Sequence, residues 1–131
     1  MSGREEQATI DAWVRHWEAE DIDGLVRLLT DDAILAMPPT PAWFAGTAEI
    51  GAFLATGPND GHLADVRLIQ TRANGQPALA AYMPRPDGTH AAYGVMVFDI
   101  VGGRVAAFTG FSDARHVARF GLPDILLAGD R

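Results

Sequence analysis

The hydrophobic residues of this chain change their spacing near residue 62, and that change limits the fold more than any other feature. Before it, apolar side chains recur at intervals of three and four residues, which is typical of amphipathic helices. Ile10, Trp13 and Trp17 form the clearest such stripe, in a helix predicted at residues 8–20. The other elements expected in this half are a short helix beginning at Ile22, a strand at Ala33–Met37 and a helix beginning at Thr47.

After residue 62 the apolar residues alternate with polar ones, as they do in half-buried strands. Tight-turn signals separate the runs, and short links join antiparallel neighbours. The strands are expected at residues 62–72, 77–84, 90–101 and 104–112, followed by a short helix at 113–120. This order predicts an α+β fold. We expect a cone-shaped α+β barrel, with three N-terminal helices packed on a curved antiparallel sheet around an internal cavity.

Size and charge exclude several classes of protein. The length of 131 residues is typical of one domain, so residues 1–131 are expected to form a single domain. A net charge of −7 opposes contact with phosphate backbones and anionic lipids, which argues against nucleic acid and membrane as partners. The chain has no cysteine, no apolar run long enough to span a membrane and no signal-peptide pattern, so a cytoplasmic location is expected.

Several local strings resemble the SnoaL-like domains of the nuclear transport factor 2 superfamily. Leu28–Ala33 is similar to its helix-to-strand junction, Pro39–Gly46 to the loop before its third helix, and Val95–Asp99 with Gly103–Val105 to its last two strands. A closer resemblance is to the SnoaL-like domain appended to some actinobacterial extracytoplasmic-function sigma factors. The strings that carry it are Met37–Pro39, Pro41–Gly46, Arg72–Ala78 and Ala118–Pro123.

The resemblance implies a fold but not the catalytic groups known in that superfamily. The tyrosine and two aspartates of its ketosteroid isomerases fall on Trp13, Met37 and Gly94, which cannot do their proton chemistry. The histidine and aspartate of SnoaL-type aldol cyclases fall on Phe108 and Gly110. The fold also hosts epoxide hydrolases, dehydratases and non-catalytic binders, so it does not imply one function.

Strand alternation predicts which side chains face the cavity. If Gly94 faces inward, so do the even-numbered neighbours on its strand, while Tyr93, Val95 and Val97 form an apolar outer face. Such a face favours a homodimer. The candidate ligand-binding residues are Trp13, Trp17, Met37, Trp43, Phe53, Gly94, Met96, Phe98, Phe108, Gly110 and Ser112. Aromatic and Met walls, with room left by the two glycines, predict a hydrophobic, flat or polycyclic small molecule as the ligand.

His90 and Tyr82 are the candidate catalytic residues. Histidine is the usual acid or base near neutral pH, and tyrosine would supply a hydroxyl donor if even positions of its strand face inward. The alternatives are exposure for His90, at a strand start, and burial in the core or an interface for Tyr82. Asp113 is read as the N-cap of the last helix. The four histidines lack metal-ligand spacing, so neither a metal nor another cofactor is expected.

Two functional hypotheses stay open. In the first, the chain is a small-molecule-binding SnoaL-like protein acting as a cyclase or isomerase of specialised, polyketide-type metabolism. In the second, it is a non-catalytic ligand-binding sensor or regulatory domain related to the sigma-factor accessory domains. The missing acid–base pairs favour the binder, while the absence of sigma-factor regions from this sequence favours the enzyme.

Overall fold

The computed structural model describes residues 3–38, 43–73 and 75–127. Residues 39–42 of the predicted loop and residue 74 of the first predicted turn lie outside these ranges. The first half of the chain forms α1 (Gly3–Glu18), α2 (Ile22–Arg27), β1 (Leu29–Ala36), β2 (Trp43–Ala45) and α3 (Thr47–Thr56). The second half forms the short 3₁₀ helices η1 (Pro58–Gly61) and η2 (Leu63–Asp65), then β3 (Arg67–Ala73), β4 (Gln76–Pro84), β5 (His90–Val101), β6 (Arg104–Phe111), α4 (Ala114–Arg119) and β7 (Ile125–Leu126).

The predicted helices and strands occur in the predicted order, but β1 begins at Leu29, four residues before the expected strand, and β2 and β7 were not predicted. A further difference concerns β3. The strand expected from residue 62 begins only at Arg67, because the preceding residues form η1 and η2. Leu63 and Val66 are buried there, so the apolar alternation is real but belongs to a compact turn. The Glu20 carboxylate accepts a hydrogen bond from the Ala64 N–H at 3.0 Å and ties this turn to the end of α1.

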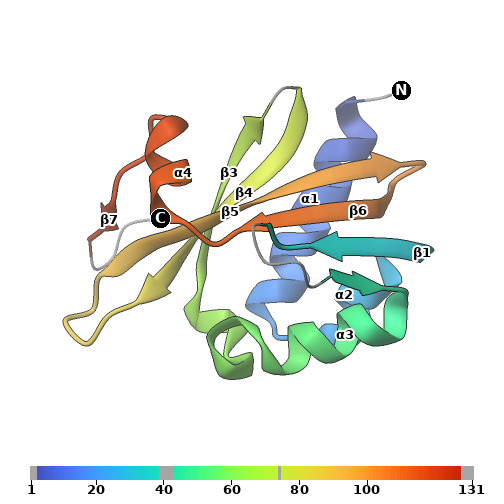
Figure 1. Ribbon diagram of the computed structural model, residues 1–131, viewed down its shortest axis with the longest axis horizontal. Helices are drawn as coiled ribbons and strands as arrows, with labels where there is room; N and C mark the ends of the chain where they lie inside the picture. The colour runs from blue at the N-terminus through green and yellow to red at the C-terminus, as the bar shows by residue number, and fades with distance from the viewer. Residues whose placement is uncertain (1–2, 39–42, 74, 128–131) are drawn as a thin grey trace.

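The strands form one curved sheet in the order β2-β1-β6-β5-β4-β3, with β7 paired to β5 beside this path (Figure 1). The predicted antiparallel meander of β3 to β6 is confirmed. The β1 strand joins it parallel to β6, at the edge remote from β3. The α+β class is therefore confirmed, but the sheet is unclosed: the described strands β2 and β3 end it without pairing to each other.

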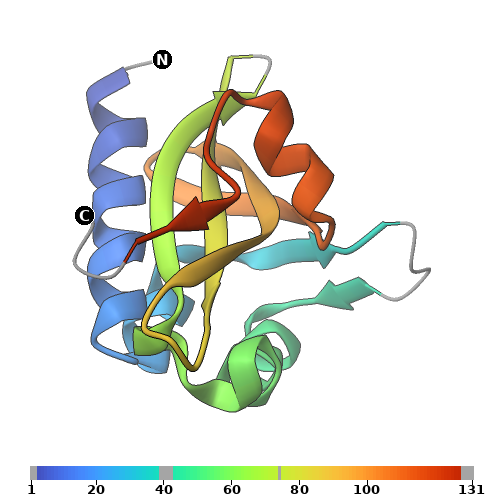
Figure 2. The same ribbon diagram turned by 90° about the vertical axis from the view of Figure 1, so that its left-hand side faces the viewer.

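Two apolar clusters lie on opposite faces of the sheet. The inner cluster contains the α1 stripe, with Ile10, Trp13 and Trp17 at most 2% exposed, as its spacing predicted. The outer cluster joins Val95 of β5 to Val117 of α4. Figure 2 shows α1 and α4 on opposite sides of β3 and β4. No helix within the described ranges is long and apolar enough to cross a membrane.

The outer cluster changes the argument for a homodimer. The apolar outer face of β5 was expected to need a second copy, but α4 and β7 of the same chain cover part of it. Val95 is only 2% exposed as a result. The homodimer stays a prediction.

Candidate ligand-binding site

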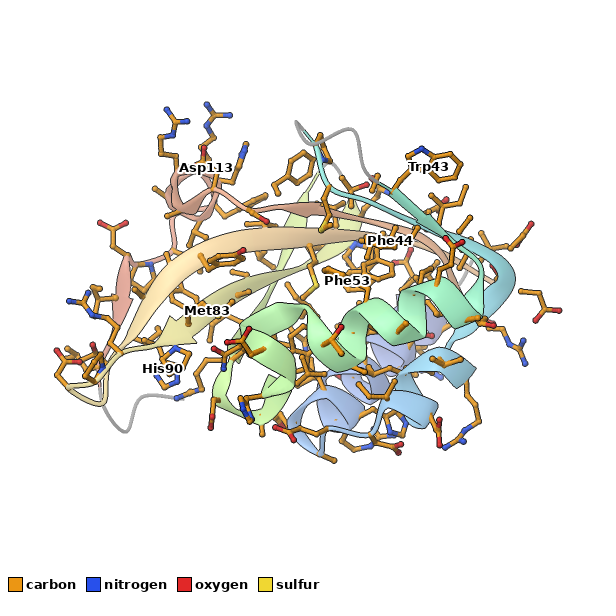
Figure 3. All side chains as sticks on the ribbon, turned by 60° about the horizontal axis from the view of Figure 1, so that its bottom comes forward. Trp43, Phe44, Phe53, Met83, His90 and Asp113 are labelled. Atoms are coloured by element: carbon orange, nitrogen blue, oxygen red, sulfur yellow. The ribbon has the colours of Figure 1, made fainter. Side chains whose placement is uncertain are left out.

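A half-open pocket of about 600 Å³ lies on the inner side of the sheet. Residues of α1, β1, α3, η1, β4, β5, β6 and α4 line it, with a few from the segments between these elements. Eight of the predicted ligand-binding residues are in its wall: Trp17, Met37, Phe53, Gly94, Met96, Phe108, Gly110 and Ser112. Figure 3 shows Phe53 between α3 and the sheet. Its ring stacks on Phe44, with centroids 4.9 Å apart.

Burial divides the pocket lining into a floor and a rim. We call the buried lining residues on the inner side of the sheet the floor: Trp17, Leu35, Leu54, Val66, Ala81, Gly94 and Phe108. Val95 also borders the pocket, but its side chain packs in the outer cluster. The rim contains most of the polar side chains, namely Asn59, Tyr93, Ser112, Asp113 and His116. The pocket therefore has an apolar interior, and its polar side chains lie at the opening among apolar ones such as Met37, Met83 and Phe111. This arrangement suits an apolar ligand with a polar end.

Three predicted lining residues lie elsewhere. Trp13 is fully buried, and its ring makes edge contacts with Phe98 and Phe108 at centroid distances of 5.1 Å each. Trp13 and Phe98 therefore belong to the core beneath the pocket wall. Trp43 is 60% exposed on β2 and projects away from the pocket (Figure 3). Strand alternation and helical spacing identified correctly which side chains belong to the inner layer. They could not show which of those side chains are packed in the core and which line the pocket.

Tyr82 does not face the pocket, and of the two alternatives for this residue it is burial in the core that the structure shows. Tyr82 belongs to the outer cluster, and its buried hydroxyl donates a hydrogen bond to the Pro123 carbonyl O at 2.8 Å. Residues with odd numbers on β4, such as Leu79 and Ala81, face the inner cluster instead. Burial, with a smaller effect of Asp124, raises the pKa of the Tyr82 hydroxyl. The side chain anchors the C-terminal segment to the sheet.

His90 does not line the pocket either. Its Nε2 donates to the carbonyl O of Asp65 at 3.0 Å, which fixes the ring against the end of η2. The other ring nitrogen, Nδ1, is buried and has no partner among the described residues. Figure 3 shows His90 near the β4–β5 turn and far from Asp113. The structure thus does not bring together the two candidate catalytic side chains.

A bulge in β5 explains where the parity argument failed. Gly94 pairs with Ala81, but Ala92 pairs with the next residue of β4, so Tyr93 is an extra residue in the ladder. Beyond this bulge the alternation reverses: Ala92 packs on the outer cluster and Tyr93 lines the pocket. A glycine inside a strand pattern often marks a β-bulge, so Gly94 was a sequence signal for this irregularity.

Gly94 and Gly110 have different roles, although both line the pocket. A Cβ at Gly94 would lie well inside van der Waals contact of the Phe111 carbonyl O, and 3.1 Å from the Ser112 Cα. Gly94 therefore permits a close approach of two backbones and does not provide room for a ligand. Among the described residues, a Cβ at Gly110 would meet only the Met37 Cγ, at 3.6 Å. Gly110 does leave space, as expected.

The titratable rim residues Asp113 and His116 were not predicted to line the pocket. As predicted, Asp113 caps α4, accepting a hydrogen bond from the Arg115 N–H at 2.9 Å. The Arg115 guanidinium lies 2.7 Å from its carboxylate, and these bonds lower the pKa of Asp113 to about 2. His116 packs its ring on Phe111 at 5.1 Å. Within the described ranges no cluster of three or more His, Asp or Glu could hold a metal ion.

Comparison with known families agrees with this geometry. A family model described as the SnoaL-like domain matches residues 10–108. The chain belongs to the SnoaL-like domain family. It is also 38% identical over 122 residues to the ECF RNA polymerase sigma factor SigG of Mycobacterium tuberculosis, a match that covers 93% of this chain. The SnoaL-like chain spans only about a third (33%) of that relative.

Solved structures show the same fold for this SnoaL-like chain. An NTF-2 like protein from Burkholderia xenovorans LB400 aligns with a TM-score of 0.66 and 18% identity, over 82% of this chain and 81% of the other. A ketosteroid isomerase candidate from Kribbella flavida aligns with a TM-score of 0.66 and 20% identity, over 84% and 78%. At such low identity the likeness concerns the fold alone.

Proposed function

We propose that this SnoaL-like domain binds a flat, apolar small molecule in the inner pocket. The observation that carries the proposal is the contrast between floor and rim, in a pocket of about 600 Å³. Pockets for small ligands range from roughly 300 to 1,000 Å³ and are mostly apolar with a few placed polar groups. The floor offers aromatic and aliphatic surface to the body of such a molecule, and the rim offers polar groups to its outer end.

Binding without turnover is the role that the rim chemistry supports best. Among the described lining residues, only Tyr93, Asp113 and His116 can titrate. A general base works best when its pKa is near the working pH, whereas the Arg115 guanidinium and N–H hold the pKa of Asp113 at about 2. The similarity to part of a sigma factor also favours a regulatory ligand-binding domain over an enzyme.

A second candidate function is a cyclase or isomerase of polyketide-type metabolism. The observation in its favour is His116, which lines the rim with Ser112 and could exchange a proton with a bound molecule. The shared fold with a ketosteroid isomerase candidate agrees with this alternative but does not require it. Both candidates need the same pocket, so binding is tested first.

The first experiment titrates the neutral, flat dye Nile red and follows its fluorescence. We expect saturable binding of one dye per chain with a blue-shifted emission. Gly110→Leu should abolish it, because the longer side chain would occupy the pocket beside Met37. Gly110→Ala is the matched control and should bind the dye, since its methyl group fits at ordinary contact distance. Equal binding to folded Gly110→Leu and wild type would refute the proposal.

The second experiment separates binding from turnover. Cyclases and isomerases of carbonyl compounds begin by removing a proton next to the carbonyl, so exchange of that proton for deuterium reports the chemistry without knowledge of the substrate. We expect 2-acetylnaphthalene in D₂O to exchange at the protein-free rate. Faster exchange that is lost in His116→Gln would establish the enzyme and reject the purely binding role.

A further inference from the structure

A second pocket, of about 370 Å³, lies on the outer side of the sheet beside α4. Two cross-strand pairs form its base: Val95 of β5 lies opposite Phe111 of β6, and Val97 lies opposite Thr109. Val95 belongs to the outer cluster and Val97 packs on it, so this pocket lies on the face of the sheet that α4 partly covers (Figure 2). We call it the outer pocket. Its volume is within the roughly 300–1,000 Å³ of small-ligand sites.

The α4 helix supplies the charged side of the outer pocket. His116, Arg119 and Phe120 line it, and their spacing of three and four residues puts them on one side of a helical turn. Val117 is buried in the outer cluster and holds α4 on the sheet. Arg119 is exposed, and no carboxylate among the described residues pairs with its guanidinium. An anion can therefore approach this guanidinium without displacing an internal partner.

The charge of the outer pocket is opposite to that of the whole chain. The chain carries a net charge of −7, yet no Asp or Glu is found among the described residues that line this pocket. The guanidinium of Arg119 is its permanent charge. Gln76, Thr109 and His116 add an amide, a hydroxyl and an imidazole, which can donate hydrogen bonds. An apolar base with a cation at one side favours an organic anion over a neutral or cationic molecule.

We propose that the outer pocket is a second ligand site, for a small organic acid with an apolar ring. The carboxylate of this acid binds the Arg119 guanidinium, whose planar fork of N–H donors matches two carboxylate oxygens. Its ring lies on the two cross-strand pairs at the base of the pocket. Val95, Phe111 and His116 border both pockets, so the two sites are neighbours across the sheet. This inference goes beyond the proposed function and does not depend on it.

The test compares 2-naphthoate with 2-naphthamide, which have the same ring and nearly the same shape but differ in charge. NMR titrations of isotope-labelled protein give both dissociation constants and locate the binding. The amide signals of Val97 and Thr109 report on the outer pocket, while Met37 and Phe53, which line only the inner pocket, are the reference. We expect the Val97 and Thr109 signals to show tighter binding of 2-naphthoate than of 2-naphthamide. Added salt should weaken only the binding of 2-naphthoate, because salt screens the charge.

Two matched variants isolate the effect of the guanidinium. Arg119→Gln should weaken 2-naphthoate binding about fivefold, the upper range for an exposed ion pair, and leave 2-naphthamide binding unchanged. Arg115→Gln is the control, because Arg115 is also exposed on α4 but lines neither pocket and pairs with Asp113. It should change the affinity for 2-naphthoate by less than about twofold. Circular dichroism should show both variants folded, since each replaces an exposed side chain.

Several outcomes would refute the outer site. Equal weakening by Arg115→Gln would mean that 2-naphthoate is attracted to a basic helix in general. Shifts confined to Met37 and Phe53, with binding lost in Gly110→Leu, would place the acid in the inner pocket. Absence of 2-naphthoate binding would also refute the inference, and sedimentation as a dimer would then assign the outer pocket to a second copy of the chain. Loss of Nile red binding alone would refute the proposed function and leave this inference standing.

Discussion

Replacing Gly94 by alanine should destabilise the protein through one added methyl group. The new Cβ would meet the Phe111 carbonyl O far inside contact distance, and the Phe111 carbonyl carbon at 3.0 Å. These are backbone atoms, so no side-chain rotation relieves the contact. The β5 and β6 strands must separate by on the order of 1 Å beside the Val95–Phe111 pair, and that movement weakens the ladder there.

The loss in the free energy of unfolding depends on which atoms the new methyl group meets. Inserting a methyl group into a packed region costs about 1–3 kcal/mol. Because the methyl group of Gly94→Ala meets backbone atoms, which cannot rotate away, we expect a cost of about 3 kcal/mol. For a chain of 131 residues, this corresponds to a fall in Tm on the order of 10 °C. Gly110→Ala is the matched control, since within the described part of the chain its methyl group meets only the Met37 side chain. It should change the free energy of unfolding by less than about 1 kcal/mol.

The assay is urea unfolding followed by circular dichroism, with thermal melting as a second measurement. Gly94→Ala should also bind Nile red more weakly, because Phe111 and Ser112 belong to the pocket wall that it displaces. If the two alanine variants unfold at the same urea concentration with the same slope, the reasoning about backbone contact is wrong.

Three further changes test the corrected positions of individual residues. Tyr82→Phe should cost about 1 kcal/mol by removing the hydrogen bond to Pro123, and should leave Nile red binding unchanged. Because the folded pKa of Tyr82 is raised, wild type should lose stability as the pH rises above the usual tyrosine value of 10.0, and the Phe variant should lose less in urea titrations at pH 9 to 12. The folded pKa of Asp113 is lowered from 3.8 to about 2, so its contribution is present above pH 4 and lost on acidification toward pH 2. Asp113→Asn should flatten that part of the acid unfolding profile; an unchanged profile would contradict the assigned pairing with Arg115. Trp43→Ala should change neither the dye affinity nor, by more than about 0.5 kcal/mol, the free energy of unfolding, since Trp43 is 60% exposed.

Local patterns predicted most of the fold because they report local physics. The stripe through Ile10, Trp13 and Trp17 predicted which face of α1 is buried, and the turn signals predicted the meander. The parallel pairing of β1 with β6 could not be predicted in this way. It joins segments about seventy residues apart, and nothing local to either strand specifies that neighbour.

The amino-acid sequence alone determined the helical and strand periodicities, the apolar character of the inner layer and eight of the residues that line the pocket. Tertiary structure decided which of the buried side chains line the pocket. A side chain in the pocket wall and one in the core follow the same sequence pattern, and they differ only in whether open space or another side chain lies against them. Trp17 and Trp13 have the same spacing and burial, yet only Trp17 borders open space. Likewise, the bulge at Tyr93 reverses the facing of β5, since one extra residue shifts the two-residue alternation of a strand.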